Sequence, residues 1–340
     1  MKALTDLIKR FQRGYSDVVG VDVGSALTKA VRLRTVNHTP TVVAVDLVSG
    51  VTMPDAATGP VTPVVLPKSM RARYVAVSYS GPGALVKLLT FPVHSEKSTD
   101  TQVNELMGLA ESPEYRVAYE VVSQNRAETR ALAVAMPDVA TSRLCALFPS
   151  GTPAPCSIEI AGLASMTAFE RGPGRQHAED AVAVIDFGST GSTVAFYNKR
   201  TLALIRKFDV GMASILKKVQ ETLGVDAEVA MGILADGSFD ISQALHQTLE
   251  SFLQQFVISR DFVERRENCH VVRLYACGAP GALKSWAQEV QSASGLEPVF
   301  WNPFEGLPVS SGAIPDALKG QESQFASALG AALAVLRQDY

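Results

Sequence analysis

The sequence contains two copies of one short pattern, and this duplication constrains the fold more than any other feature. Val19–Ser25 reads VGVDVGS and Val184–Ser189 reads VIDFGS, so each copy is an apolar strand that ends in Asp-x-Gly-Ser. A second β-prone run follows each copy, at Thr28–Leu33 and at Ser192–Tyr197. The two aspartates are 164 residues apart, one at the start of each half of the chain. The pattern predicts a duplicated chain with a strand–turn–strand unit in each half.

Such a turn can bind phosphate. It differs from P-loop and Rossmann turns, which lead from a strand into a helix. Glycine lets the backbone approach a ligand closely, and the N–H and hydroxyl groups of the turn can hold phosphate oxygens. An aspartate before the turn can hold Mg²⁺ through water. A single turn also has a purely geometric explanation, since tight hairpins favour Asp and Gly, and the turns could close hairpins around an empty pocket. Two copies favour a clamp on a nucleotide phosphate chain.

The rest of the chain alternates strands and helices, as in an α/β protein. The first half contains mainly short aliphatic runs bounded by Gly, Pro or Ser, which indicate strands. A Pro-rich stretch at residues 50–69 predicts an extended surface connection. From residue 211 helices dominate. The expected helices are Thr99–Ala110, Asp138–Phe148, Met212–Leu223, Ala227–Leu234, Ile241–Arg265, Ala282–Ser292 and Gln324–Arg337.

The composition excludes several classes of protein. The 340 residues are 47% hydrophobic, which is too high for a disordered chain. A formal net charge of −3 argues against a general nucleic-acid binder. The longest apolar run, Ala326–Leu336, is about half of a transmembrane span. Four cysteines without a CxxC pair predict free thiols and no zinc ribbon. We therefore expect a cytosolic protein.

The first 16 residues form a basic amphipathic segment. Its apolar residues have helical spacing, and residues 1–14 carry a charge of +3, so the remaining residues sum to −6. Charges interrupt any apolar core of a signal peptide. The segment either packs on the protein's own surface or makes weak contact with an anionic membrane. The residues concerned are Leu4, Leu7, Ile8 and Phe11, with Lys2, Asp6, Lys9, Arg10 and Arg13.

Both turns resemble the two phosphate motifs of the actin-like ATPase superfamily. Lys29, seven residues after Asp22, falls where actin carries a phosphate-contacting lysine. The segment Leu274–Gly281 resembles the element that contacts adenosine. Within the superfamily the chain is most similar to the PilM-like proteins of type IV pilus assembly, which are related to FtsA. The similar segments are Asp17–Val31, Val86–Pro92, Asn104–Glu105, Tyr119–Val122, Trp301–Phe304 and the closing helix Ala326–Leu336.

The resemblance implies an α/β, actin-like (ribonuclease H-like) fold of two lobes, with a small α+β subdomain inserted in the first. The expected bounds are 17–80, 156–180 and 324–340 for the first lobe, 81–155 for the inserted subdomain, and 181–323 for the second lobe, whose helical part is at about 212–268.

The resemblance also implies that ATP or ADP binds with Mg²⁺ between the lobes. Asp22 and Asp186 would hold the metal. Gly278, Ala279 and Glu228 would contact adenosine. The phosphates would contact Asp22, Gly24, Ser25, Ala26, Lys29, Asp186, Gly188, Ser189 and Thr190.

Three departures from the family predict a weak or absent ATPase. Ala161 occupies the place of the glutamate that orients the attacking water, and Glu159 lies on the opposite strand face. Loss of such a group typically costs 10²–10⁴-fold in rate. Cys277 replaces the first glycine of the adenosine motif, where a side chain would crowd the base. Relatives often pair a glutamate with a lysine three residues later. Here Glu228 is present, but Met231 occupies the position of the lysine.

The function that the resemblance implies is a cytosolic scaffold, peripheral to the inner membrane, in a type IV pilus or type II secretion platform. It would dock the cytosolic tail of a PilN-like membrane protein in a groove lined from about residues 71–155, with Leu85–Phe91 and Thr129–Met136 as candidate strands. Self-association is a further expectation, and no nucleic-acid partner is expected. The alternative is a sugar or small-acid kinase of the same fold, which needs a positioned base. Asp138 is the one candidate base, and it fits a helix cap better.

Overall fold

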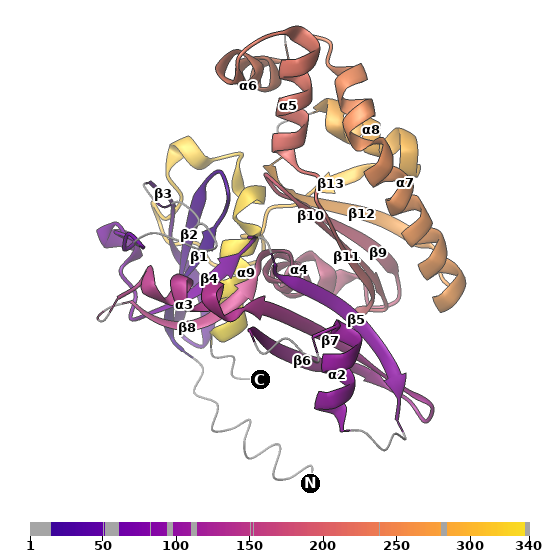
Figure 1. Cartoon of the computed structure of the whole chain (residues 1–340). Coiled ribbons are helices and arrows are strands. Elements are labelled where there is room, and N and C mark those ends of the chain that lie inside the picture. Colours follow the sequence, from indigo (N-terminus) through magenta and orange to yellow (C-terminus); the bar gives the residue numbers. More distant parts are fainter. Residues whose placement is uncertain are drawn as a thin grey trace.

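A computed structural model describes residues 15–49, 51, 61–81, 83–93, 98–109, 114–149, 151, 153–237, 239–279 and 284–336. Two five-stranded sheets and one three-stranded sheet form the framework (Figure 1). Residues 1–14 of the predicted basic segment, most of the first half of the Pro-rich stretch and the end of the predicted last helix lie outside the described residues.

The first lobe is built on the sheet β3-β2-β1-β4-β8. Its strand β1 is antiparallel to β2 and parallel to β4. Helices α4 and α9 cover one face of this sheet, and α3 packs with residues 61–72 on the other face. The bounds are β1 Asp17–Val23, β2 Thr28–Val36, β3 Thr39–Val48, β4 Tyr74–Tyr79, α3 Asp138–Ala146, β8 Ala154–Ile160, α4 Ala161–Arg171 and α9 Ala326–Val335.

The second lobe repeats this arrangement in the sheet β11-β10-β9-β12-β13. As in the first lobe, a hairpin is followed by two strands parallel to its first strand. This repeat confirms the duplicated α/β architecture that the two turns predict. The bounds are β9 Ala181–Phe187, β10 Ser192–Asn198, β11 Thr201–Phe208, α5 Met212–Leu223, α6 Ala227–Asp236, α7 Ser242–Glu267, β12 Val271–Gly278, α8 Lys284–Ser294 and β13 Pro298–Phe300.

The inserted subdomain lies between β4 and β8 in the chain and has a small core of its own. Its sheet β5-β7-β6 is antiparallel, and α2 packs against it. The Ser98 hydroxyl caps the first turn of α2, and Gly108, at φ 79°, ends the helix in the left-handed conformation that glycine adopts readily. The expected domain bounds stay a prediction. The observed elements are β5 Leu85–Pro92, α2 Thr99–Met107, β6 Tyr115–Gln124 and β7 Glu128–Pro137.

Helix α9 packs closely on the rest of the first lobe through small residues. A Cβ atom on Gly330 would lie 1.7 Å from the carbonyl oxygen of Ala164 in α4. A Cβ atom on Gly20 in β1 would lie 1.9 Å from the carbonyl oxygen of Ala328. Glycine at these positions therefore lets α9 lie directly on both α4 and β1. No described helix combines the length and hydropathy needed to cross a membrane.

Candidate functional site

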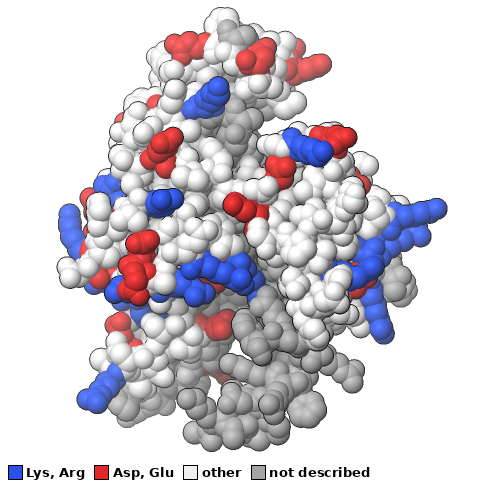
Figure 2. All heavy atoms as spheres, turned by 180° about the vertical axis from the view of Figure 1, so that it is seen from behind, with Lys and Arg blue, Asp and Glu red and all other residues white. Residues whose placement is uncertain are grey.

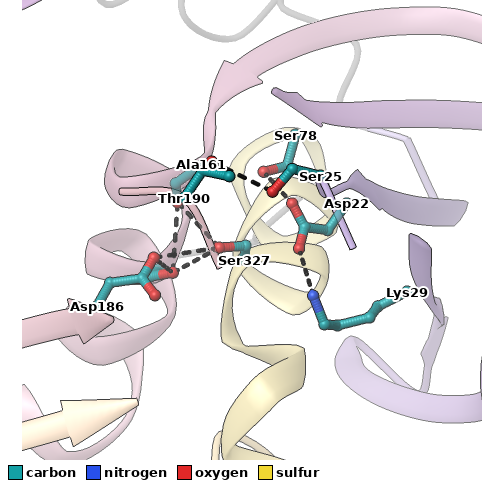
Figure 3. A network of polar contacts seen from close by, with 9 residues as sticks. Asp22, Ser25, Lys29, Ser78, Ala161, Asp186, Thr190 and Ser327 are labelled. Carbon is teal, nitrogen blue, oxygen red and sulfur yellow. Dashed lines mark hydrogen bonds and ion pairs between the residues drawn. The ribbon is translucent and has the colours of Figure 1, made fainter. Parts of the chain in front are cut away.

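The two Asp-x-Gly-Ser turns face each other across a cavity of about 140 Å³ between the lobes (Figure 3). The structure brings nearly all the residues of the predicted nucleotide site to its wall, although their binding of nucleotide stays a prediction. The predicted residues that line the cavity are Asp22, Gly24, Ser25, Ala26, Lys29, Asp186, Gly188, Ser189, Thr190, Gly278 and Ala279.

The first carboxylate, on Asp22, is held by groups from both neighbouring strands. Strand register pairs Asp22 with Lys29 of β2 and with Ser78 of β4. Lys29 Nζ donates to Asp22 Oδ2 at 3.1 Å, and Ser78 Oγ donates to Oδ1 at 3.1 Å. The carboxylate is therefore fixed, and the Lys29 ammonium group stays close to the cavity as a cation that can turn toward an anionic ligand.

The second carboxylate, on Asp186, is tied to the two central helices. Ser165 Oγ of α4 donates to Asp186 Oδ2 at 2.7 Å, and Ser327 Oγ of α9 lies 3.4 Å from the same oxygen. The two serine hydroxyls are 2.7 Å apart. Burial raises the pKa of Asp186 to about 6, although the hydrogen bond from Ser165 opposes the rise. The negative charge of Asp22 contributes to the same rise. A cation between the two carboxylates would relieve this repulsion.

The first turns of α4 and α9 lie at the wall of the cavity. Neither α4 nor α9 has a side-chain cap, and Ala161, Gly162, Ala326 and Ser327 of their first turns line the wall. Uncapped N–H groups and helix dipoles favour an anion such as phosphate. Among the described residues no group of three or more His, Cys, Asp or Glu side chains is arranged to hold a metal ion. The two carboxylates fit a hydrated Mg²⁺ that takes its remaining ligands from phosphate and water.

The cavity is closed at its mouth by the tips of the two turns. Ser25 Oγ and Thr190 Oγ1 are 3.2 Å apart and form a hydrogen bond between the lobes. Ligand pockets usually measure about 300–1,000 Å³, so about 140 Å³ accommodates phosphate groups but not a whole nucleotide. A nucleotide that bound here would therefore require the two turns to separate.

Two predicted positions lie elsewhere than the family resemblance implies. Glu228 is exposed on α6 and does not line the cavity, because Asp226 caps this helix and directs its first turn to solvent. Cys277 was expected to crowd the base, but its side chain does not line the cavity. Its side chain is fully buried in the core between the lobes, where burial raises the pKa of the thiol well above its usual value.

The position expected to carry a catalytic glutamate has no carboxylate in the cavity. Ala161 begins α4, and its carbonyl oxygen accepts hydrogen bonds from Ser165 and Ser327. The Glu159 side chain accepts a bond from Ser157 and lines a different groove. Asp138, at the start of α3, forms an ion pair with Arg116 of β6 and is not part of the cavity wall. None of these residues supplies a base at the cavity.

Several polar residues at the site were not found from the sequence, among them Ser78, Ser165, Ser327 and Lys207. Ser78, Ser165 and Ser327 each interrupt a run of buried apolar residues, which is a signal that could have identified them. Lys207 of β11 lines the cavity and donates to the carbonyl oxygen of Ala84 at 3.0 Å, so it joins the second lobe to the inserted subdomain. No sequence signal marks Lys207.

A separate groove of about 560 Å³ lies between the inserted subdomain and the first lobe. Strands β6 and β7 form one wall, α4 forms another, and the β10–β11 hairpin of the second lobe completes it. It includes Leu132 and Val134 of the expected Thr129–Met136 strand but no residue of Leu85–Phe91. The apolar residues include Leu132, Val134, Leu163 and Met166, and the charged ones are Glu120, Glu159, Glu170 and Arg200.

The fold is similar to that of a solved structure. No family model and no curated protein match the sequence. A chain of the solved "PilM-PilN type IV pilus biogenesis complex" superimposes with a TM-score of 0.77 at 17% identity, covering 94% of this chain and 98% of that chain. The chain therefore has the two-lobed actin-like fold that its sequence predicts, and at this identity the likeness shows the fold alone.

Other solved structures are less similar. The ethanolamine utilization protein EutJ from Carboxydothermus hydrogenoformans has a TM-score of 0.46 at 14% identity, with 98% and 96% coverage of this chain and that one. The archaeal actin homolog Ta0583 has a TM-score of 0.45 at 13% identity, with 94% and 98% coverage.

Proposed function

We propose that this chain is a PilM-like scaffold that docks the cytosolic tail of a PilN-like membrane protein, which would hold it at the inner membrane. The observation that carries the proposal is the fold that the chain shares, over nearly its whole length, with a chain of the PilM–PilN complex. Sequence segments similar to the PilM-like family support it. Type IV pilus and type II secretion platforms are the two settings that fit this role.

The groove between the inserted subdomain and the first lobe is the proposed docking site. Its aliphatic wall, formed by Leu132, Val134 and Met166, would bury apolar side chains of the tail. Three of its four charged residues are carboxylates, so it favours a tail with basic residues or a free amino terminus. Burial raises the pKa of Glu170, and the charge of Glu120 adds to the rise. A cation in the groove would offset this repulsion.

ATP or ADP with Mg²⁺ is the proposed ligand of the cavity between the lobes. Asp22 and Asp186 would hold the hydrated metal, which would neutralise phosphate charge. The turns and the N-termini of α4 and α9 would hold the phosphate oxygens. Because Ala161 supplies no group to orient water, we expect the nucleotide to stabilise one arrangement of the lobes rather than to be hydrolysed efficiently.

The docking proposal is tested with a synthetic peptide of the cytosolic tail of a PilN-like protein encoded beside this chain. Glu120→Lys reverses a charge in the groove and should weaken binding about tenfold in fluorescence anisotropy. Glu305→Lys makes the same charge change at an exposed position outside the groove and should leave binding unchanged. Equal affinity of wild type and Glu120→Lys would exclude this groove as the docking site.

A further inference from the structure

A basic surface lies on the first lobe at the end of the sheet away from the cavity. Asp17 begins β1, and its carboxylate accepts hydrogen bonds from Arg32 Nε and Nη2 at 2.8 and 2.7 Å. Arg34 Nη2 donates to the same carboxylate at 3.1 Å. Arg32 Nη1 also donates to the carbonyl oxygen of Ser69 at 3.0 Å. These bonds hold the short 3₁₀ helix Lys68–Met70 beside the two arginines.

Three further cations complete this surface. Strand register pairs Val18 with Tyr74, which places Arg73 next to Asp17 across the β1–β4 pair. Lys68, Arg71 and Arg73 are exposed, and none forms an ion pair with a described residue. We define the basic surface as Arg32, Arg34, Lys68, Arg71 and Arg73.

The basic surface stands out against the charge of the whole chain. Its five cations outweigh the single carboxylate of Asp17 and leave a formal charge of +4, whereas the chain as a whole has −3. Figure 2 shows Lys and Arg side chains projecting together from the edge of the molecule that belongs to the first lobe.

Aromatic and aliphatic groups accompany these cations. The rings of Tyr15 and Tyr74 are 4.2 Å apart, and the Arg73 guanidinium lies 5.4 Å from the Tyr74 ring centroid. Val65, three residues before Lys68, is 82% exposed. Tyrosines and long basic side chains with apolar stems are typical of surfaces at a membrane–water interface.

We propose that the basic surface binds the headgroups of anionic phospholipids and holds the first lobe directly on the membrane. Its charge supplies the attraction, and the exposed Val65 side chain can enter the headgroup layer. Strand β1 runs from this surface to the Asp22 turn, roughly 20 Å away for seven residues. The cavity between the lobes therefore stays accessible while the lobe is on lipid. This contact does not depend on docking of a partner tail.

The test is co-sedimentation of the full chain with vesicles. Phosphatidylcholine vesicles containing phosphatidylglycerol should bind the protein, whereas phosphatidylcholine alone should not, and high salt should release it. The combined variant Lys68→Gln, Arg71→Gln and Arg73→Gln should bind about 100-fold more weakly, since each charge contributes about fivefold. The combined variant Lys217→Gln, Arg265→Gln and Lys284→Gln removes the same charge from exposed positions of the second lobe and should bind as wild type does.

Two further measurements separate loss of charge from loss of structure. The charge-preserving variant Lys68→Arg, Arg71→Lys and Arg73→Lys should bind anionic vesicles as wild type does, and all variants should keep the thermal midpoint of wild type. Absence of wild-type binding to anionic vesicles would overturn the proposal. Equal loss in the two glutamine variants would overturn it as well. So would binding of duplex DNA that the first variant loses while no vesicle binding is seen.

Discussion

At the scale of single residues, the polar side chains of the site are fixed by partners that are distant in sequence. Asp22 is held by Lys29 and Ser78, and Asp186 by Ser165 and Ser327. The two aspartates were predictable because each belongs to a motif. The serines stand out as polar residues within apolar runs, but their contact with a carboxylate was not predictable, because it depends on strand register and on the packing of α4 against α9.

Asp17 allows a prediction on the dependence of stability on pH. Burial raises the pKa of Asp17, but the hydrogen bonds and charges of Arg32 and Arg34 outweigh burial and hold the pKa below its ordinary value. Its contribution to stability is therefore fully present above the unfolded-state pKa of about 3.9 and is lost as the pH falls through the lower folded-state pKa. Asp17→Asn should lower the free energy of unfolding by about 1–2 kcal/mol at pH 7.

Urea unfolding of wild type and Asp17→Asn, from pH 7 down to the lowest pH at which the chain folds, measures this effect. The difference between the two proteins should shrink in the acid range. Asp316→Asn is the matched control, since its exposed ion pair with Lys319 should contribute less than the Asp17 cluster. A difference that stays constant with pH would show that the Asp17 charge is not the cause.

At the scale of elements, most helices and strands could be predicted from local sequence. The expected helix Met212–Leu223 has the observed bounds of α5, and the expected helix Thr99–Ala110 ends three residues earlier, at Met107, because Gly108 terminates it. Strand β11 was not expected, although it completes the second sheet. Its contacts with other elements, rather than its own sequence pattern, fix it as a strand. It pairs with β10, and its Lys207 side chain contacts the inserted subdomain.

The contact between α4 and α9 yields a prediction about a single methyl group. Gly330→Ala would place a Cβ atom 1.7 Å from the Ala164 carbonyl oxygen, so one helix must move. We expect a loss of about 3 kcal/mol in the free energy of unfolding. Gly232→Ala, in the middle of α6, meets nothing within 4 Å and should stabilise the protein by about 0.5–1 kcal/mol.

Chemical denaturation of both glycine variants provides the comparison. We expect Gly330→Ala to lower the free energy of unfolding and Gly232→Ala to raise it. Helix propensity favours alanine equally at both positions, so the difference in sign would come from packing. If Gly330→Ala were as stable as wild type, then α9 would not lie as close to α4 as the structure places it.

At the scale of the whole molecule, the two lobes meet at the cavity and also through the inserted subdomain. Arg130 of β7 donates to the carbonyl oxygen of Ala203 in β11 at 2.7 Å and pairs with Glu267 at the end of α7 at 3.1 Å. The β10–β11 hairpin also lines the docking groove. A change in the distance between the lobes would therefore alter the groove as well as the cavity.

Separation of the lobes can be tested with a reversible crosslink. Ser25→Cys combined with Thr190→Cys replaces the hydroxyl groups that are 3.2 Å apart at the cavity mouth. The oxidised variant should not admit nucleotide, and reduction should restore binding. The single variant Ser25→Cys, treated with the same oxidant, controls for the native cysteines, of which Cys145 is exposed. Undiminished nucleotide binding by the crosslinked protein would show that entry does not require the turns to part.

The claim that the two repeated turns form one phosphate clamp is tested most directly by calorimetric titration of the full chain with ATP and Mg²⁺. Wild type should bind with measurable affinity. Asp22→Ala and Asp186→Ala should each weaken binding by tenfold or more, because each removes one of the two carboxylates that would hold the metal. Equal, measurable affinity in wild type and both variants would contradict the clamp, as would no binding to wild type.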